Sequence, residues 1–332
     1  MKNFPGRRAV LGTAAVSALF ALTACGGNVG AASSSDKFPS NPITLTVGQS
    51  AGGSTDLIAR AVADGSGKDL GVAMPVVNKA GANGALATKE IAGKPADGYN
   101  LVLLNASLIT ITPLAVSADE TVTLDNLDVI KGLSQDDYVM VASKQSGIKS
   151  VADLKKSTKT LTFGTAGVGT GSQLAQALLL KQAGIKGTEV PFDSGSPALA
   201  AVLGNQVQVS TIQLGEAKPQ IDAGKVTPLV VFSSERNKFL KDVPTAVEEG
   251  YDVPVSQYRA IAAPKGLPQA VKDQLVKSID AALGQDSYKQ FNEKNMLTPK
   301  EISGDEVVTE WNGLAAKYKD LTAKYNISLT SK

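Results

Sequence analysis

Short apolar runs alternate with longer amphipathic stretches along most of the chain. The runs rich in β-branched and aromatic residues predict strands at 43–47, 74–77, 99–104, 138–142, 160–163, 188–190, 207–212, 227–232 and 258–262. Stretches with a helical spacing of apolar residues predict helices at 54–70, 84–92, 151–155, 172–183, 198–203 and 215–223. This alternation predicts an α/β protein whose largely parallel sheets are flanked by helices.

The pattern changes after residue 262. Two amphipathic helices are predicted at 269–283 and 306–325, and no strong strand pattern follows them. Two sheets in one chain would form two lobes with a cleft between them, at the carboxyl ends of the strands. Trp311 suits either stacking on a ligand or packing against the sheet edge of the other lobe. We expect packing, because a lone aromatic residue on such a helix usually belongs to the core.

The first 24 residues follow the plan of an export signal. Three basic residues within 1–8 precede an apolar run over 9–22, and no acidic residue occurs before Asp36. The run is too short to be interpreted as a membrane-spanning helix. Arg7 and Arg8 also resemble a twin-arginine signal, and the sequence leaves the export route open.

A lipid-attachment motif follows the apolar run. Leu22-Thr23-Ala24-Cys25 resembles a bacterial lipobox, in which the cysteine is lipidated and becomes the new N-terminus. An ordinary signal cleaved nearby would instead leave Cys25, the only cysteine, as a spare thiol. We expect the lipobox, and therefore an extracytoplasmic protein anchored to the outer face of the cell membrane, on the periplasmic side if two membranes are present. Residues 25–37, rich in Gly, Ala and Ser, would be a flexible tether.

Composition argues against several classes of protein. The 33 basic and 31 acidic residues nearly balance, so nucleic acid is not an expected partner. The chain has no histidine, which excludes a Ser-His-Asp triad and every histidine-based metal site. We therefore expect a binding protein with no catalytic residue, no metal and no cofactor. A surface enzyme that uses Asp, Lys or Tyr remains an alternative.

Small residues cluster at three predicted strand-to-helix junctions, at 48–56, 164–172 and 193–198. The first N–H groups of a helix have no intrahelical partner, and the helix dipole favours an anion there. Neither a P-loop nor a dinucleotide-binding fingerprint matches these segments. The junctions therefore predict a site for a small carboxylate. Asp56 is the exception, because we expect it to stabilise the first helical turn rather than to bind the ligand.

The order and spacing of short motifs extend over the whole folded part. They occur at 38–44 (FPSNPIT), 51–56 (AGGSTD), 78–84 (NKAGANG), 96–99 (ADGY), 163–170 (FGTAGVGT), 190–192 (VPF), 195–198 (GSPA), 242–245 (DVPT) and 263–268 (APKGLP). In this arrangement the chain resembles the Bug-type (TctC-like) receptors, the solute-binding subunits of tripartite tricarboxylate transporters.

This resemblance implies a type II periplasmic-binding-protein fold. Residues 38–141 and 255–332 would form one lobe, and residues 142–254 would form the other. Closure about a hinge near 141 and 255 would bury a mono-, di- or tricarboxylate and create the face that the transporter's membrane subunits recognise. A monomer is expected. A ligand-sensing co-receptor for a membrane sensor protein is the alternative, because it would use the same closed face.

The resemblance also implies a set of ligand-binding residues. The first lobe would offer Ala51, Gly52, Gly53, Thr55, Asn105 and Ser107. The second lobe would offer Thr165, Gly167, Gly169 and Thr170, with Phe192 and Asp193 nearby and Tyr258 as a hinge-side aromatic.

This sequence departs from the family pattern at Gln49, Ala51, Asp193-Ser194, Ile212 and Arg259. An aspartate is frequent at the position of Ile212, and a small or aromatic residue at that of Arg259. Losing the acid and gaining an arginine would favour a more anionic ligand. The alternative, which we favour, is that Arg259 points to solvent, as most arginines do.

Overall fold

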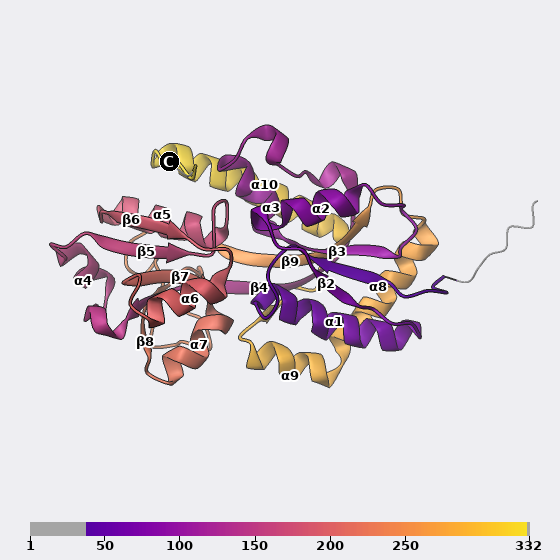
Figure 1. Ribbon diagram of the computed structural model, residues 1–332, viewed down its shortest axis with the longest axis horizontal. Coiled ribbons are helices and arrows are strands. Elements are labelled where there is room, and N and C mark those ends of the chain that lie inside the picture. Colours follow the sequence, from indigo (N-terminus) through magenta and orange to yellow (C-terminus); the bar gives the residue numbers. More distant parts are fainter. Residues whose placement is uncertain (1–37, 331–332) are drawn as a thin grey trace, which may run out of the picture. The chain divides into compact units, whose positions relative to one another are not determined.

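The computed structural model describes residues 38–330 (Figure 1). The predicted signal peptide, Cys25 and the predicted tether lie outside the described residues. Within 38–330, every helix is too short or too polar to cross a membrane.

The first sheet has a parallel part that is extended by antiparallel strands. It comprises β2 (Val76–Asn78), β1 (Thr44–Val47), β3 (Asn100–Asn105), β9 (Ser256–Pro264) and β4 (Leu127–Ser143), in this order, and β10 (Thr298–Pro299) also pairs with β4. β1 runs parallel to both β2 and β3, whereas β9 is antiparallel to β3 and β4. The helices α1 (Ser54–Leu70), α8 (Gln269–Gly284) and α9 (Asp286–Lys294) contribute to the apolar cluster on one face of the sheet.

The second sheet repeats this plan. Its strands are β4, β7 (Val209–Gln213), β5 (Leu161–Thr165) and β6 (Gly187–Pro191), in this order, and β8 (Val226–Val231) pairs with β4. β5 is parallel to β6 and β7, whereas β4 is antiparallel to β7. The flanking helices are α4 (Val151–Lys156), α5 (Gly171–Ala183), α6 (Gly195–Leu203) and α7 (Leu214–Asp222). The expected α/β architecture is confirmed. We call the two sheets with their helices the first and second lobes.

Strand β4 belongs to both sheets, as Figure 1 shows. It pairs with β9 as far as Asp137 and with β7 from Tyr138 onward. The apolar pattern predicted only the part at 138–142. The polar residues Gln135, Asp136 and Asp137 interrupt the pattern before it, because this stretch crosses from one lobe to the other and carries buried polar contacts.

The second face of the first sheet is covered by α2 (Ala85–Ala92), α3 (Ala106–Thr110) and α10 (Gly304–Lys324). Trp311 of α10 is 1% exposed and packs there with residues of β3 and β9. Its predicted packing role is confirmed, but the sheet it packs on is that of its own lobe. Two to three turns further along the same helix, Tyr318 and Leu321 belong to the core of the second lobe.

Candidate functional site

A cavity of about 360 Å³ lies between the two lobes, and this volume suits a small ligand. All three glycine-rich junctions contribute to its wall. The first junction contributes 48–50 and 53–55, the second 166–168 with Thr170, and the third 193–195 together with Phe192. The carboxyl ends of β1, β5 and β6 therefore meet at one site, as the alternation of strands and helices predicts.

The cavity brings together about half of the predicted binding residues. Those that line it are Gly53, Thr55, Asn105, Gly167, Thr170, Phe192 and Asp193. Those that lie outside its wall are Ala51, Gly52, Ser107, Thr165, Gly169 and Tyr258. Ser107 and Thr165 are buried behind the wall, whereas Ala51 and Gly52 are exposed beside it.

The alternation of side chains along β9 explains the position of Tyr258. Gln257 and Arg259 make their hydrogen bonds on the cleft side, to Tyr138, Ser54 and Thr55 among others. Tyr258, between them, faces the opposite side of the strand, where the ammonium group of Lys300 lies 5.8 Å from its ring centre.

The amino terminus of α1 contacts both lobes. The Ser54 backbone N–H donates to Glu216 Oε1 of α7 at 3.1 Å, and the Thr55 hydroxyl donates to Asn105 Oδ1 at 3.2 Å. Asp56 lies in the first turn, where its Oδ2 accepts the backbone N–H of Gly52 at 2.8 Å. Its expected role as a first-turn acid is confirmed.

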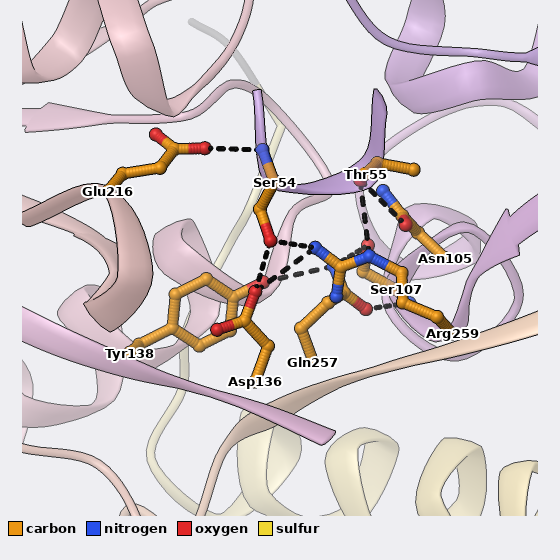
Figure 2. A network of polar contacts seen from close by, with 9 residues as sticks. All are labelled: Ser54, Thr55, Asn105, Ser107, Asp136, Tyr138, Glu216, Gln257 and Arg259. Atoms are coloured by element: carbon orange, nitrogen blue, oxygen red, sulfur yellow. Dashed lines mark hydrogen bonds and ion pairs between the residues drawn. The ribbon is translucent and has the colours of Figure 1, made fainter. Parts of the chain in front are cut away.

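A buried ion pair between Arg259 and Asp136 contacts the first residues of α1 (Figure 2). Arg259 Nη2 lies 3.3 Å from Asp136 Oδ2, and both side chains are fully buried. The Ser54 hydroxyl donates to the same Asp136 oxygen at 2.7 Å, and Arg259 Nε donates to Thr55 Oγ1 at 3.2 Å. The expectation that Arg259 points to solvent is therefore wrong. The arginine is also not part of the cavity wall, because it is paired with Asp136 behind Ser54 and Thr55.

The second junction satisfies some of its own backbone donors. Ala166 N donates to the Ser172 hydroxyl at 2.9 Å, and Gly169 N donates to Gln173 Oε1 at 2.8 Å. The backbone N–H groups of Gly167 and Val168, both at the cavity wall, have no acceptor among residues 38–330. These two donors are therefore among those that this loop can offer to a ligand.

Sequence reasoning did not single out several residues of the cavity wall, namely Asn83, Tyr138, Gln213, Glu216 and Gln257. Gln257 directly precedes the strand predicted at 258–262, and nothing in the sequence marks it as a wall residue. Glu216 had no signal either. It lies in the first turn of α7, where an acidic residue ordinarily just complements the helix dipole.

Glu216 has an unusual environment for a carboxylate. One oxygen, Oε1, accepts the Ser54 N–H, while Oε2 is buried and has no partner among the described residues. Oε2 lies so close to Gly195, at the start of α6, that a β-carbon there would collide with it. Burial raises the pKa of Glu216 to about 7, although the Ser54 N–H opposes this rise.

The raised pKa of Glu216 predicts a pH-dependent stability of the ligand-free protein. The folded state retains this proton up to about pH 7, whereas an ordinary glutamate with a pKa of 4.5 has already lost it. The folded state thus binds more protons in this range, and the contribution of Glu216 to the free energy of unfolding falls as the pH rises from about 4.5 to 7.

The Glu216→Gln variant lacks this pH-dependent contribution. Thermal unfolding should show that its melting temperature, relative to the parent, is higher at about pH 8 than at about pH 5. A difference that does not change with pH would contradict this assignment.

The chain matches the family model described as "Tripartite tricarboxylate transporter family receptor" over residues 58–326. The chain therefore belongs to this family. One relative is a protein of Agrobacterium vitis described as "UPF0065 protein in the TAR-I ttuE-ttuC' intergenic region", which is 33% identical over 257 residues, or 76% of this chain and 74% of the relative. Protein BugT of Bordetella pertussis is 29% identical over 279 residues, or 81% of this chain and 83% of BugT.

Two solved structures show the same fold. The periplasmic binding protein BugD has a TM-score of 0.82 at 26% identity, with 89% of this chain and 100% of BugD covered. MatC from Rhodopseudomonas palustris, solved with bound malate, has a TM-score of 0.79 at 26% identity, with 86% of this chain and 99% of MatC covered. The predicted periplasmic-binding-protein fold is thereby confirmed. The family and these neighbours are binding proteins rather than enzymes.

Proposed function

We propose that this chain is an extracytoplasmic receptor that captures a small carboxylate between its lobes for a tripartite tricarboxylate transporter. The observation that carries the proposal is the cavity walled by three glycine-rich junctions, in a chain that belongs to the receptor family. The malate bound to MatC supports a carboxylate as the ligand class. Backbone N–H groups such as those of Gly167 and Val168 suit this class, because hydrogen bonds to a charged oxygen are strong ones.

The ligand contacts follow from the cavity wall. We assign direct contact to the predicted residues that line it, Gly53, Thr55, Asn105, Gly167, Thr170, Phe192 and Asp193. Among the other predicted residues, Ser107 and Thr165 would support the wall from behind. Ser107, for example, donates its backbone N–H to Gln257 Oε1 at 3.2 Å, and Gln257 lines the cavity.

Capture would proceed by closure of residues 38–141 and 255–332 against residues 142–254. Hydrogen bonds between the lobes support this mechanism. The carbonyl oxygen of Gly169 in the second lobe accepts from Asn83 Nδ2 and from Thr112 Oγ1 of the first lobe, each at 3.1 Å. The strand β4, which passes through both sheets, would supply one hinge where its partner changes after Asp137.

The remaining parts of the proposal concern the setting of the receptor. Lipidation of Cys25 and a tether over 25–37 would keep a monomeric receptor close to the membrane subunits of its transporter. Mass spectrometry of the protein isolated from membranes would test the anchor. An acylated Cys25 as the first residue is expected, and an unmodified Cys25 would contradict it.

The central test is ligand binding. Calorimetry with a panel of mono-, di- and tricarboxylates should find at least one that binds with a dissociation constant of about micromolar order. The Gly167→Val variant should abolish that binding, because the new β-carbon lies 2.9 Å from the Phe192 carbonyl oxygen and changes a loop that needs a φ of +123°. Circular dichroism serves as the control for folding. A panel in which no carboxylate binds would refute the proposed function.

A further inference from the structure

The charged residues that line the cavity are all acidic. Two carboxylates, Asp193 and Glu216, line the cavity, and no lysine or arginine of residues 38–330 does so. The nearest candidate for a counter-charge, Arg259, lies behind the wall and is paired with Asp136 at 3.3 Å. A ligand that carried two or three negative charges would therefore meet no cationic side chain here, and it would face two acidic ones.

The carboxylate of Glu216 already occupies a helix start that could otherwise hold an anion. Its Oε1 accepts the first-turn N–H of Ser54, and its Oε2 lies against Gly195, the first residue of α6 (Figure 2 shows the contact with Ser54). The first and third glycine-rich junctions thus both face an acid of the chain itself. The second junction contains no acidic residue, and its Gly167 and Val168 N–H groups have no acceptor among residues 38–330, so we place a carboxylate of the ligand there.

Glu216 also lacks a partner of its own. Its Oε2 is enclosed and receives no hydrogen bond from residues 38–330. A buried carboxylate oxygen without a donor is costly, and structures rarely retain one unless something else supplies the donor. Because Glu216 lines the cavity, a bound molecule can supply it.

From this arrangement, and resting on the proposed carboxylate-receptor function, we propose that the cavity selects a carboxylate that also carries an ammonium group. The ammonium group would donate a hydrogen bond to Glu216 Oε2. The ligand class is thus an amino acid, with its carboxylate at Gly167 and Val168, rather than a plain di- or tricarboxylate. Such a ligand would donate a hydrogen bond to Glu216 Oε2 and accept hydrogen bonds from the backbone N–H groups of Gly167 and Val168. Its positive charge would also lie near the two acidic residues of the cavity wall.

The test compares ligands that differ only in the ammonium group. Calorimetry would be run with alanine and propionate, aspartate and succinate, glutamate and glutarate, and 4-aminobutyrate and butyrate. Within the pair that binds most tightly, the amino form should bind at least about tenfold more tightly, the size expected for one charge-assisted hydrogen bond. In Glu216→Gln, binding of the amino form should weaken by about 10- to 100-fold, whereas binding of the acid without the amino group should be unchanged or tighter.

Two further variants make the result specific. Glu216→Asp retains the charge and should keep the preference for the amino form, so it reports on Glu216 even if Glu216→Gln folds poorly. Glu249→Gln removes an exposed acid of the second lobe, outside the cavity wall, and should change nothing. Equal or tighter binding of the acids that lack the amino group, or a preference that survives in Glu216→Gln, would overturn the inference while leaving the receptor function standing. Binding of no member of any pair, nor of any other carboxylate, would overturn both.

Discussion

Replacing Arg259 by methionine should lower the free energy of unfolding at about pH 8 by roughly 3–5 kcal/mol, the usual cost of leaving one member of a buried ion pair unpaired. The partner is Asp136, whose side chain has no exposed surface and whose Oδ2 lies 3.3 Å from Arg259 Nη2. Burial raises the pKa of Asp136 to about 6 even though Arg259 and the Ser54 hydroxyl oppose the rise, so removing Arg259 leaves a buried carboxylate without its counter-charge. Urea unfolding followed by circular dichroism measures the loss.

The pH dependence of this loss identifies its cause. Without Arg259, Asp136 would retain its proton in the folded state to a still higher pH, while in the unfolded state its pKa stays near 3.8. The penalty is therefore largest at high pH and should shrink as the pH falls towards about 4. The double variant Arg259→Met, Asp136→Leu removes both charges and should recover most of the stability. A single-variant loss that is equal at about pH 8 and about pH 5 would show that lost packing, not the unpaired charge, is responsible.

Replacing Gly169 by valine should weaken ligand binding by about 100-fold or more, because it places a side chain where the lobes touch. A β-carbon at Gly169 would lie 2.9 Å from Thr112 Cα and 3.0 Å from Thr112 Oγ1, both in the first lobe. Adding those atoms would separate the lobes and break the hydrogen bonds that the Gly169 carbonyl oxygen accepts from Asn83 and Thr112. Calorimetry with the ligand identified for the parent protein measures the effect.

The matched control for this variant is Gly147→Val. Gly147 has a φ of +74°, close to the +71° of Gly169, so both substitutions introduce a similar backbone strain. No atom lies within 4 Å of a β-carbon at Gly147, and the residue follows β4 away from the cavity. The control should thus lose some stability and keep its affinity. Equal losses of affinity in both variants would argue that strain, rather than contact between the lobes, explains the result.

The regular elements of the fold could be predicted from the sequence because most of them follow a simple apolar period. The elements that were not predicted are α3, α9, β10 and the first half of β4, where Gln135, Asp136 and Asp137 look like a loop. These residues are polar because they lie where the two sheets meet, and their partners come from distant parts of the chain: Ser54, Asn237 and Ser256. A single sequence gives no indication of such long-range partners.

The candidate site was predictable where backbone conformation decides it. Segments rich in glycine at predicted helix starts can be recognised in the sequence, and all three such junctions line the cavity. Charged residues were harder to place. Arg259 looked like a solvent-exposed arginine and is buried against Asp136, while Glu216 looked like an ordinary first-turn acid and instead contacts the other lobe at Ser54. In both residues the surroundings, not the residue type, set the role.

Helix α10 limits the motions available to the two lobes. Trp311 is packed in the core of the first lobe, and Tyr318 and Leu321, about two to three turns further along, are packed in the core of the second. Beyond the helix, Gln173 of α5 also donates to the Leu329 carbonyl oxygen at 3.1 Å. A rotation that swung the lobes widely apart would have to extract one of these large side chains. The pivot must therefore lie close to α10, and the cleft can widen most on the side farthest from this helix.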